Sequence, residues 1–288
     1  MRQLLKYDNS RWKELVALPE KTLQVFITNK CNKRCRGCFY EKGLGTGEMP
    51  LHGYKRLVLR HKSEITKVIL MGGEPTMHPM LPEMIAFNQM HGLKTTVYTN
   101  GFNLNAFDGI NMSGVSLRIG VLGLTKGEKR LVEVQKTRLP VTIVYMLRKD
   151  NLGELMPTAK YAEENFNCHD FYISSIRDIA ATGSFWLDTE ETISVDEFAG
   201  RAQEFVNAYN GKLERIHIAR RGILETESHG RYPEAKECRF LNVFPDGRRV
   251  ICPFDISLGR YSEEEGFVKR KCNKHSECLL QKIVLERV

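Results

Sequence analysis

The sequence predicts an α/β fold, in which six β/α units form a partial, TIM-like barrel and a small domain follows at the C-terminus. Short, mostly apolar segments rich in β-branched residues alternate with amphipathic ones, as in parallel strands covered by helices. A full eight-stranded barrel takes about 250 residues, whereas residues 21–220 supply only about 200. The expected strands are Leu23–Thr28, Lys67–Met71, Lys94–Thr99, Val115–Val121, Val141–Leu147 and Phe171–Ile176.

The elements around these strands divide the chain into three parts. Residues 1–20 are expected to form an N-terminal arm or short helix, residues 21–220 the partial barrel, and residues 221–288 the C-terminal domain. Thr125–Glu128 and Ser194–Glu197 both have the spacing of a capping box, so each is expected to open a helix. Apolar stripes at helical spacing occur at Leu51, Tyr54, Leu57 and Val58, at Leu81, Met84 and Ile85, and at Leu152, Leu155, Met156 and Ala159.

The composition is that of a globular protein, with 42% hydrophobic and 27% charged residues in 288. No apolar run approaches the 18 or so residues of a membrane span, and the first residues lack the apolar core of a signal peptide. We therefore expect a cytoplasmic protein with no membrane partner. The formal charge of +8 suits an anionic substrate or nucleic acid, but a solvated basic surface with no specific partner is the favoured alternative. A basic tail or a basic run interleaved with aromatic residues is missing, so nucleic acid is an open alternative without a specific signal.

The segment that carries the clearest chemistry is Cys31–Cys38, directly after the first expected strand. Three thiols within eight residues suit one soft metal centre and leave one coordination position for a ligand that is not protein. A zinc site is the alternative, since clustered cysteines in an intracellular protein are usually metal-binding or catalytic. A disulfide is less favoured because no secretory signal precedes the cysteines.

The spacing C-x3-C-x2-C, together with Gly72-Gly73-Glu74-Pro75 at the end of the second strand, resembles the radical SAM superfamily. The resemblance implies that Cys31, Cys35 and Cys38 hold a 4Fe–4S cluster whose fourth iron binds S-adenosylmethionine. It also implies a partial barrel and an electron donor such as flavodoxin or ferredoxin. One departure is Gly37, which stands where many members have an aromatic residue.

The same resemblance assigns candidate cofactor-binding residues at the strand ends. Gly72, Gly73 and Glu74 are expected to meet the methionine amino group, the two glycines because they permit close backbone approach. Thr99 and Asn100 end the third strand and are expected at the same mouth of the barrel, with an ordinary turn as the alternative.

Recognition of the cofactor's ribose and carboxylate is less clearly marked. Family members often have a Ser-x-Asp-Gly-like segment on the fourth strand, but residues 118–123 here lack the hydroxyl and the carboxylate. Arg118 is a candidate clamp for the cofactor carboxylate, or else a member of an ordinary ion pair. Asn151 is a candidate for the ribose or a helix cap, and Tyr40 for the adenine neighbourhood or the core.

Four more cysteines follow in the last part of the chain, and a turn signal at Phe244–Arg248 predicts a hairpin between the first two. Their spacing resembles the SPASM/twitch module of radical SAM enzymes, which implies an auxiliary 4Fe–4S cluster in a twitch-type domain. The alternative is zinc held by the four cysteines, or by three of them with His275. Cys168 is expected to be a small buried hydrophobic residue. The four cysteines that the resemblance implies as ligands of the auxiliary cluster are Cys238, Cys252, Cys272 and Cys278.

Taken together, the resemblance implies an enzyme that cleaves S-adenosylmethionine reductively to a 5′-deoxyadenosyl radical and removes a hydrogen atom from its substrate. The expected net result is oxidation or bond formation on a small polar molecule, such as a sugar, a nucleotide or another anionic metabolite. Peptide maturation is the alternative within the class. A non-catalytic, metal-stabilised binding protein is the alternative from another class. No residue is assigned a catalytic role.

Overall fold

The computed structural model describes residues 10–15, 20–35, 38, 40–175, 192–219, 240–250 and 282–288. The chain divides into two compact units. The first unit contains Glu20–Ile119 and Lys236–Lys271. The second unit contains Met1–Pro19, Gly120–Ala235 and Cys272–Val288.

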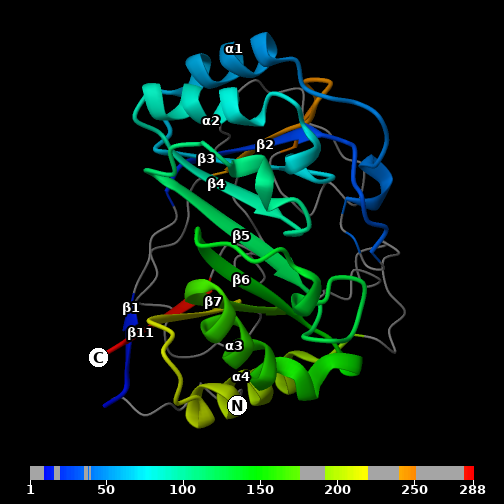
Figure 1. The fold of residues 1–288 in the computed structure, drawn as a ribbon. Coiled ribbons are helices and arrows are strands. Elements are labelled where there is room, and N and C mark those ends of the chain that lie inside the picture. The colour runs from blue at the N-terminus through cyan, green and yellow to red at the C-terminus, as the bar shows by residue number, and fades with distance from the viewer. Residues whose placement is uncertain are drawn as a thin grey trace. The chain divides into compact units, whose positions relative to one another are not determined.

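The first unit is built on a mainly parallel sheet (Figure 1). Strands β2 to β5 are parallel neighbours, β9 extends the sheet by pairing in parallel with β2, and β10 pairs antiparallel with β9. The hairpin expected around Phe244–Arg248 is therefore confirmed. The strands are β2 (Thr22–Thr28), β3 (Lys67–Gly72), β4 (Lys94–Thr99), β5 (Val115–Val121), β9 (Phe240–Val243) and β10 (Arg249–Val250).

Two helices, α1 (Leu51–His61) and α2 (Leu81–Met90), lie side by side over one face of this sheet (Figure 1). Most of their apolar stripes are buried, with Leu51 and Leu57 half-buried, and the Tyr54 hydroxyl donates a 2.7 Å hydrogen bond to Asn88 Oδ1 between the helices. Because side chains alternate along a strand, the opposite face carries a different set of residues. That face holds an apolar cluster that includes Phe26, Ile69 and Met71. The expected helical stripes are confirmed in this unit.

The second unit has its own parallel strands, β6 (Pro140–Leu147), β7 (Asn167–Ser175) and β8 (Arg215–Ala219). Strand β11 (Lys282–Arg287) pairs antiparallel with β8, and β1 (Trp12–Leu15) antiparallel with β11. Helix α3 (Leu155–Asn165) packs on β6 and β7, and α4 (Val195–Ala208) places Phe205 5.9 Å from the ring of Phe171. Short 3-10 helices η1 to η5 span Glu41–Gly43, Pro75–Met77, Leu104–Phe107, Leu131–Glu133 and Lys149–Glu154.

All six expected strands are confirmed, most within one residue at each end and the last from Asn167 to Ser175. The N-terminal expectation of a helix is wrong for residues 12–15, which form β1 because the last residues of the chain supply β11 as its partner. One capping box is confirmed, since Ser194 Oγ accepts a 3.0 Å hydrogen bond from the Glu197 amide at the start of α4. The other is wrong: Thr125–Glu128 opens no helix, and its Thr125 hydroxyl donates to Glu154 instead.

The described parts of residues 221–288 add strands to the sheets of both units. None of the helices in the described part of the chain has the length and hydropathy that a membrane span requires. The mixed α/β class with a parallel sheet, as expected from the strand and helix pattern, is therefore confirmed.

A charged group lies at the β7–β8 pair of the second unit. Arg215 donates to both carboxylate oxygens of Asp170, at 2.6 and 3.1 Å, and His217 Nε2 lies 3.4 Å from one of them. Burial alone would raise the pKa of Asp170, but the hydrogen bonds and charges of His217 and Arg215 outweigh it and lower that pKa to about 2. This carboxylate is therefore held in its charged form by the fold.

We expect Asp170→Asn to reduce the acid sensitivity of the protein. Since the folded-state pKa lies below the unfolded value of about 3.9, the ionised carboxylate stabilises the fold above about pH 4. This stabilisation is lost as the pH falls toward 2. Urea unfolding midpoints between about pH 5 and pH 2.5 should fall more steeply for the wild type than for the variant. Equal pH dependence of the unfolding midpoint in the wild type and the variant would contradict this expectation. The control is Glu204→Gln, which removes an exposed ion pair with Arg201 on α4.

Candidate functional site

The cysteine segment begins directly beyond the C-terminal end of β2. The structure describes Cys31, Cys35 and Cys38; all three are partly exposed and none forms a disulfide. The Lys33 amide lies 3.4 Å from Cys31 Sγ, and the Cys38 amide donates to the Cys35 carbonyl at 3.2 Å. The chain thus carries three cysteines within eight residues directly after one strand end. Residues 36, 37 and 39 lie outside the described residues.

Two backbone hydrogen bonds join the start of this loop to the end of β3. The Gly73 amide donates to the Thr28 carbonyl at 2.8 Å, and the Glu74 amide donates to the Lys30 carbonyl at 2.7 Å. A Cβ atom on Gly72 would overlap the Thr28 carbonyl, and one on Gly73 would overlap that of Lys30. Gly72 also has φ of +145°, which side chains disfavour. Both glycines are therefore required by the contact between β3 and the start of the cysteine loop.

Glu74 is the polar centre of this region, with only 1% of its surface exposed. Its Oε1 atom accepts hydrogen bonds from the hydroxyls of Thr76 (2.8 Å) and Thr99 (2.6 Å) and from the Thr76 amide (3.2 Å). Its Oε2 atom accepts a 2.7 Å bond from the Asn100 amide. A buried carboxylate is stable only when its acceptor sites are used in this way. Glu74 thus fixes the ends of β3 and β4 against each other.

The link from these strand ends to the cysteine loop is made by two asparagines. Asn100 Nδ2 donates a 2.7 Å hydrogen bond to Asn32 Oδ1, and Asn32 stands next to Cys31. The residue after Asn32 makes a second contact to the same region, since the Lys33 ammonium lies 3.7 Å from the centre of the Phe102 ring. Sequence reasoning missed Asn32 and Phe102. The signal for Asn32 was its place inside the cysteine motif, where a polar side chain can reach the next strand end.

The donor set of the loop fits an iron–sulfur cluster in its chemistry. Three thiols and a backbone amide directed at one sulfur match the thiolate ligation and N–H···S bonding of such clusters. Lys30, Lys33 and Arg34 supply positive charge beside it. Among the residues that the structure describes, no three His, Cys, Asp or Glu side chains are gathered closely enough to hold a metal ion. Convergence of the three sulfurs on one cluster is accordingly part of the proposal below.

In a comparison with known protein families, residues 25–138 match the model of the radical SAM superfamily. The matched part contains the cysteine loop and the Glu74 region and is about two fifths of the chain. The match begins in β2 and covers the ends of β3 and β4 with the contacts described above.

Two curated proteins are similar in sequence to part of this chain. An S-adenosylmethionine-dependent nucleotide dehydratase of a Thermoplasmatales archaeon (strain ISO4-H5) is 30% identical over 102 residues, which is 35% of this chain and 37% of that protein. A "Probable GTP 3′,8-cyclase" of Thermococcus kodakarensis is 28% identical over 164 residues, which is 50% of this chain and 53% of that protein. The chain therefore spans about half or less of these relatives.

Among solved structures, the fold is similar to that of SuiB of Streptococcus suis, crystallised with its precursor peptide SuiA. The TM-score is 0.62 and the sequence identity 14%, with 91% of this chain and 64% of SuiB covered. At this identity the likeness concerns the fold. It shows that the described α/β architecture is shared with SuiB.

Tyr40 was expected either near the adenine or in the core, and its surroundings are those of a core residue. It is 2% exposed, its ring stacks on Phe26 at 4.7 Å, and it lies 5.9 Å from the ring of Phe244. Its hydroxyl donates to Asn29 Oδ1 at 2.5 Å. These contacts join Tyr40, which follows the cysteine loop, to the β9–β10 hairpin, and they favour the core alternative over a role in adenine binding.

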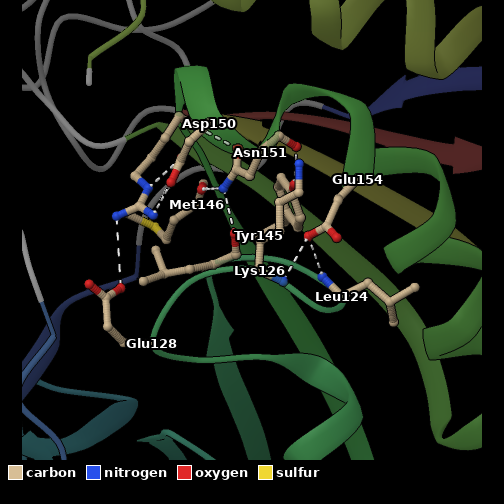
Figure 2. A network of polar contacts seen from close by, with 10 residues as sticks. Leu124, Lys126, Glu128, Tyr145, Met146, Asp150, Asn151 and Glu154 are labelled. Carbon is tan, nitrogen blue, oxygen red and sulfur yellow. Dashed lines mark hydrogen bonds and ion pairs between the residues drawn. The ribbon is translucent and has the colours of Figure 1, made fainter. Parts of the chain in front are cut away.

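Arg118 and Asn151 belong to different units. Arg118 donates to the Tyr98 hydroxyl at 2.5 Å and lies 5.4 Å from the centre of that ring, in the first unit. Asn151 is 1% exposed in the second unit, where Nδ2 donates to the Met146 carbonyl at 2.9 Å and Oδ1 accepts from the Arg148 amide at 2.7 Å. These bonds (Figure 2) favour the capping alternative for Asn151.

The auxiliary cysteines, Cys238, Cys252, Cys272 and Cys278, lie outside the described residues.

Proposed function

We propose that the protein is a radical SAM enzyme that generates a 5′-deoxyadenosyl radical and uses it to remove a hydrogen atom from a substrate. The observation that carries the proposal is the cysteine loop after β2, hydrogen-bonded through Asn32 and Asn100 to the buried Glu74. When bound, a 4Fe–4S cluster supplies the electron for reductive cleavage of S-adenosylmethionine. The partial (β/α)6 barrel expected for residues 21–220 is part of the same proposal.

In this proposal the chain's own residues have separate tasks. Cys31, Cys35 and Cys38 supply three thiolate ligands, so that one iron stays available to the amino and carboxylate groups of S-adenosylmethionine. Gly72 and Gly73 place the end of β3 against the loop, and the Glu74 network holds both in register. Thr99 and Asn100 act through Glu74 and Asn32 and are therefore positioning residues.

For the substrate we favour a small anionic molecule, and a nucleotide in particular. Two relatives with sequence similarity are named for nucleotide chemistry. Lys67 lies on β3 and Arg118 on β5. The alternation of side chains along the strands places both on the same face of the sheet as Met71 and Tyr98. Burial, followed by the charge of Arg118, lowers the pKa of Lys67 to about 8. Lys67 begins β3, at the strand end away from the cysteine loop, so Arg118, farther along β5, is the cation that we propose for an anionic substrate.

Peptide maturation is the second candidate, because the fold similarity to peptide-bound SuiB covers 91% of the chain. Direct binding assays separate the two candidates. Nucleoside triphosphate binding that weakens in Arg118→Gln would favour the nucleotide, whereas binding of a short peptide encoded near the gene would favour peptide maturation.

An auxiliary 4Fe–4S cluster on Cys238, Cys252, Cys272 and Cys278, and a flavodoxin or ferredoxin as electron donor, complete the proposal. The described hairpin of β9 and β10 lies between the first two of these cysteines in the sequence. Two clusters would give about eight irons with matching acid-labile sulfide, and zinc in their place would support a non-catalytic, metal-stabilised protein.

The experiment that tests the function is anaerobic reconstitution with iron and sulfide, followed by dithionite and S-adenosylmethionine. We expect 5′-deoxyadenosine and methionine as products. A protein that carries its full complement of iron and sulfide, yet forms no 5′-deoxyadenosine with or without candidate substrates, would contradict catalysis of this kind.

A further inference from the structure

Three aromatic rings from distant parts of the sequence pack together in the first unit. Phe26 comes from β2, Tyr40 stands two residues after Cys38, and Phe244 directly follows β9. The ring centroids of Phe26 lie 4.7 Å from Tyr40 and 4.8 Å from Phe244, and those of Tyr40 and Phe244 are 5.9 Å apart. Each ring is at most 5% exposed. Such ring contacts contribute more than the buried area alone, so the packing of Tyr40 depends on Phe244.

Tyr40 joins the two sides of the cysteine loop. Its hydroxyl donates a 2.5 Å hydrogen bond to Asn29 Oδ1, and these two residues stand on either side of the three cysteines. The Asn29 amide donates to the Gly47 carbonyl at 2.7 Å, and its carbonyl accepts from the Gly45 amide at 2.9 Å. A Cβ atom on Gly43 would lie 2.5 Å from the Tyr40 ring, so the chain after Tyr40 packs closely against that ring. The position of the Tyr40 ring therefore affects how the loop is closed.

The third cysteine belongs to the same packing. Cys38 is partly buried and packs against the apolar cluster that contains Tyr40 and Phe244. The Cys38 carbonyl accepts a 3.1 Å hydrogen bond from the Glu41 amide, and the Tyr40 carbonyl accepts a 2.9 Å bond from the Gly43 amide. Both bonds close short turns, so Cys38 and Tyr40 cannot move far independently of each other.

Phe244 is held in turn by the β9–β10 hairpin. Its amide donates to the Arg248 carbonyl and its carbonyl accepts from the Gly247 amide, both at 2.9 Å. Gly247 has φ of +84°, which the turn requires and side chains disfavour. Because β9 pairs in register with β2, the hairpin is anchored to the strand that carries Phe26. Phe244 thus presents its ring to Tyr40 from a fixed backbone.

We infer that Phe244 is a positioning residue for the cysteine loop. Its ring holds the ring of Tyr40, and Tyr40 holds the closure of the loop and the place of Cys38. Residues that orient metal ligands without touching the metal still affect the affinity for the metal. This inference rests on the proposed function, in which the loop binds a cluster, and it adds a residue from near the end of the chain to the support of that cluster.

The first test compares the Phe244→Leu and Leu241→Ala variants of the iron-free full-length chain by hydrogen exchange. Leu241 lies on β9 with its side chain on the opposite face from Phe244, and it is fully buried. Its truncation leaves a cavity and so destabilises the hairpin at least as much as the loss of a ring. We expect the amides of residues 40–45 to exchange about two- to tenfold faster in Phe244→Leu, and at the wild-type rate in Leu241→Ala.

The second test measures how fast the reconstituted variants lose the cluster to a chelator. S-adenosylmethionine changes the EPR spectrum of the reduced cluster to which it binds, so this change reports the cluster of the cysteine loop separately from one with four protein ligands. The change should be lost about two- to tenfold faster in Phe244→Leu than in the wild type or Leu241→Ala. Where the leucine variant folds poorly, Phe244→Met gives the same comparison with a side chain that fills irregular space.

The outcomes separate this inference from the proposed function. If residues 40–45 exchange at the wild-type rate in the Phe244 variants, or equally fast in Leu241→Ala, Phe244 only stabilises the hairpin and the inference is wrong. Equal rates of cluster loss in the wild type and the Phe244 variants would also overturn it. A wild-type chain that takes up no iron would contradict the proposed function, whereas the exchange measurement needs no iron and still decides whether Phe244 holds the loop.

Discussion

Replacing Cys35 with alanine is expected to abolish formation of 5′-deoxyadenosine. Two thiolates from Cys31 and Cys38 cannot hold a cluster that takes three protein ligands, so the chain would lose the iron to which S-adenosylmethionine binds. The product should fall to the level of a protein-free reaction, measured by chromatography after anaerobic reconstitution. Iron should fall from about eight to about four per chain if the auxiliary cluster is present.

Cys168→Ala is the matched control for that experiment. Its thiol is 6% exposed, and burial raises its pKa to about 12, so it is neither a reactive thiolate nor a ready ligand. The control should keep its iron and its activity. Retention of full iron and 5′-deoxyadenosine formation by Cys35→Ala would remove Cys35 from the ligand set and with it the basis of the proposal.

Much of the fold could be predicted because short runs of β-branched and apolar residues leave a local signal. Lys94–Thr99 and Val115–Val121 were predicted to the residue, since each is a short β-branched or apolar run that ends at a turn. Residues 12–15 could not be assigned in this way, because their strand depends on β11, which lies at the other end of the chain. The Thr125–Glu128 pattern failed for a similar reason: Glu154, 29 residues beyond Thr125, accepts the amides that a capped helix would have used.

The candidate site was predicted in its parts but not in its connections. The cysteine loop and the Gly72-Gly73-Glu74 segment can be found from spacing alone. The direction in which Glu74 points cannot, because it depends on Thr99 and Asn100 reaching it from the next strand. The two glycines illustrate the difference: they were expected to admit a ligand, and the structure shows that the chain's own carbonyl groups already require them.

Glu74→Ala is expected to have the largest effect on stability of any single change near the cysteine loop. It leaves the Thr76 and Asn100 amides and two threonine hydroxyls buried without their acceptor. Each buried group without a partner costs about 1–3 kcal/mol, so the sum is comparable with the total of about 5–15 kcal/mol that stabilises a typical domain. Urea unfolding should show a much lower midpoint, whereas Glu83→Gln on the exposed side of α2 should leave it unchanged.

Glu74→Gln separates folding from function in this network. The glutamine keeps the shape and one carbonyl acceptor, but its NH2 group meets a donor that the carboxylate had satisfied, such as the Asn100 amide. Because Asn100 also holds Asn32 beside Cys31, a folded Glu74→Gln chain should bind iron less tightly and release it faster to a chelator. If the variant is destabilised but releases iron at the wild-type rate, Glu74 stabilises the strand ends without positioning the cysteine loop. If it releases iron faster and Asn32→Ala does the same without loss of stability, the path from Glu74 through Asn100 to the loop is established.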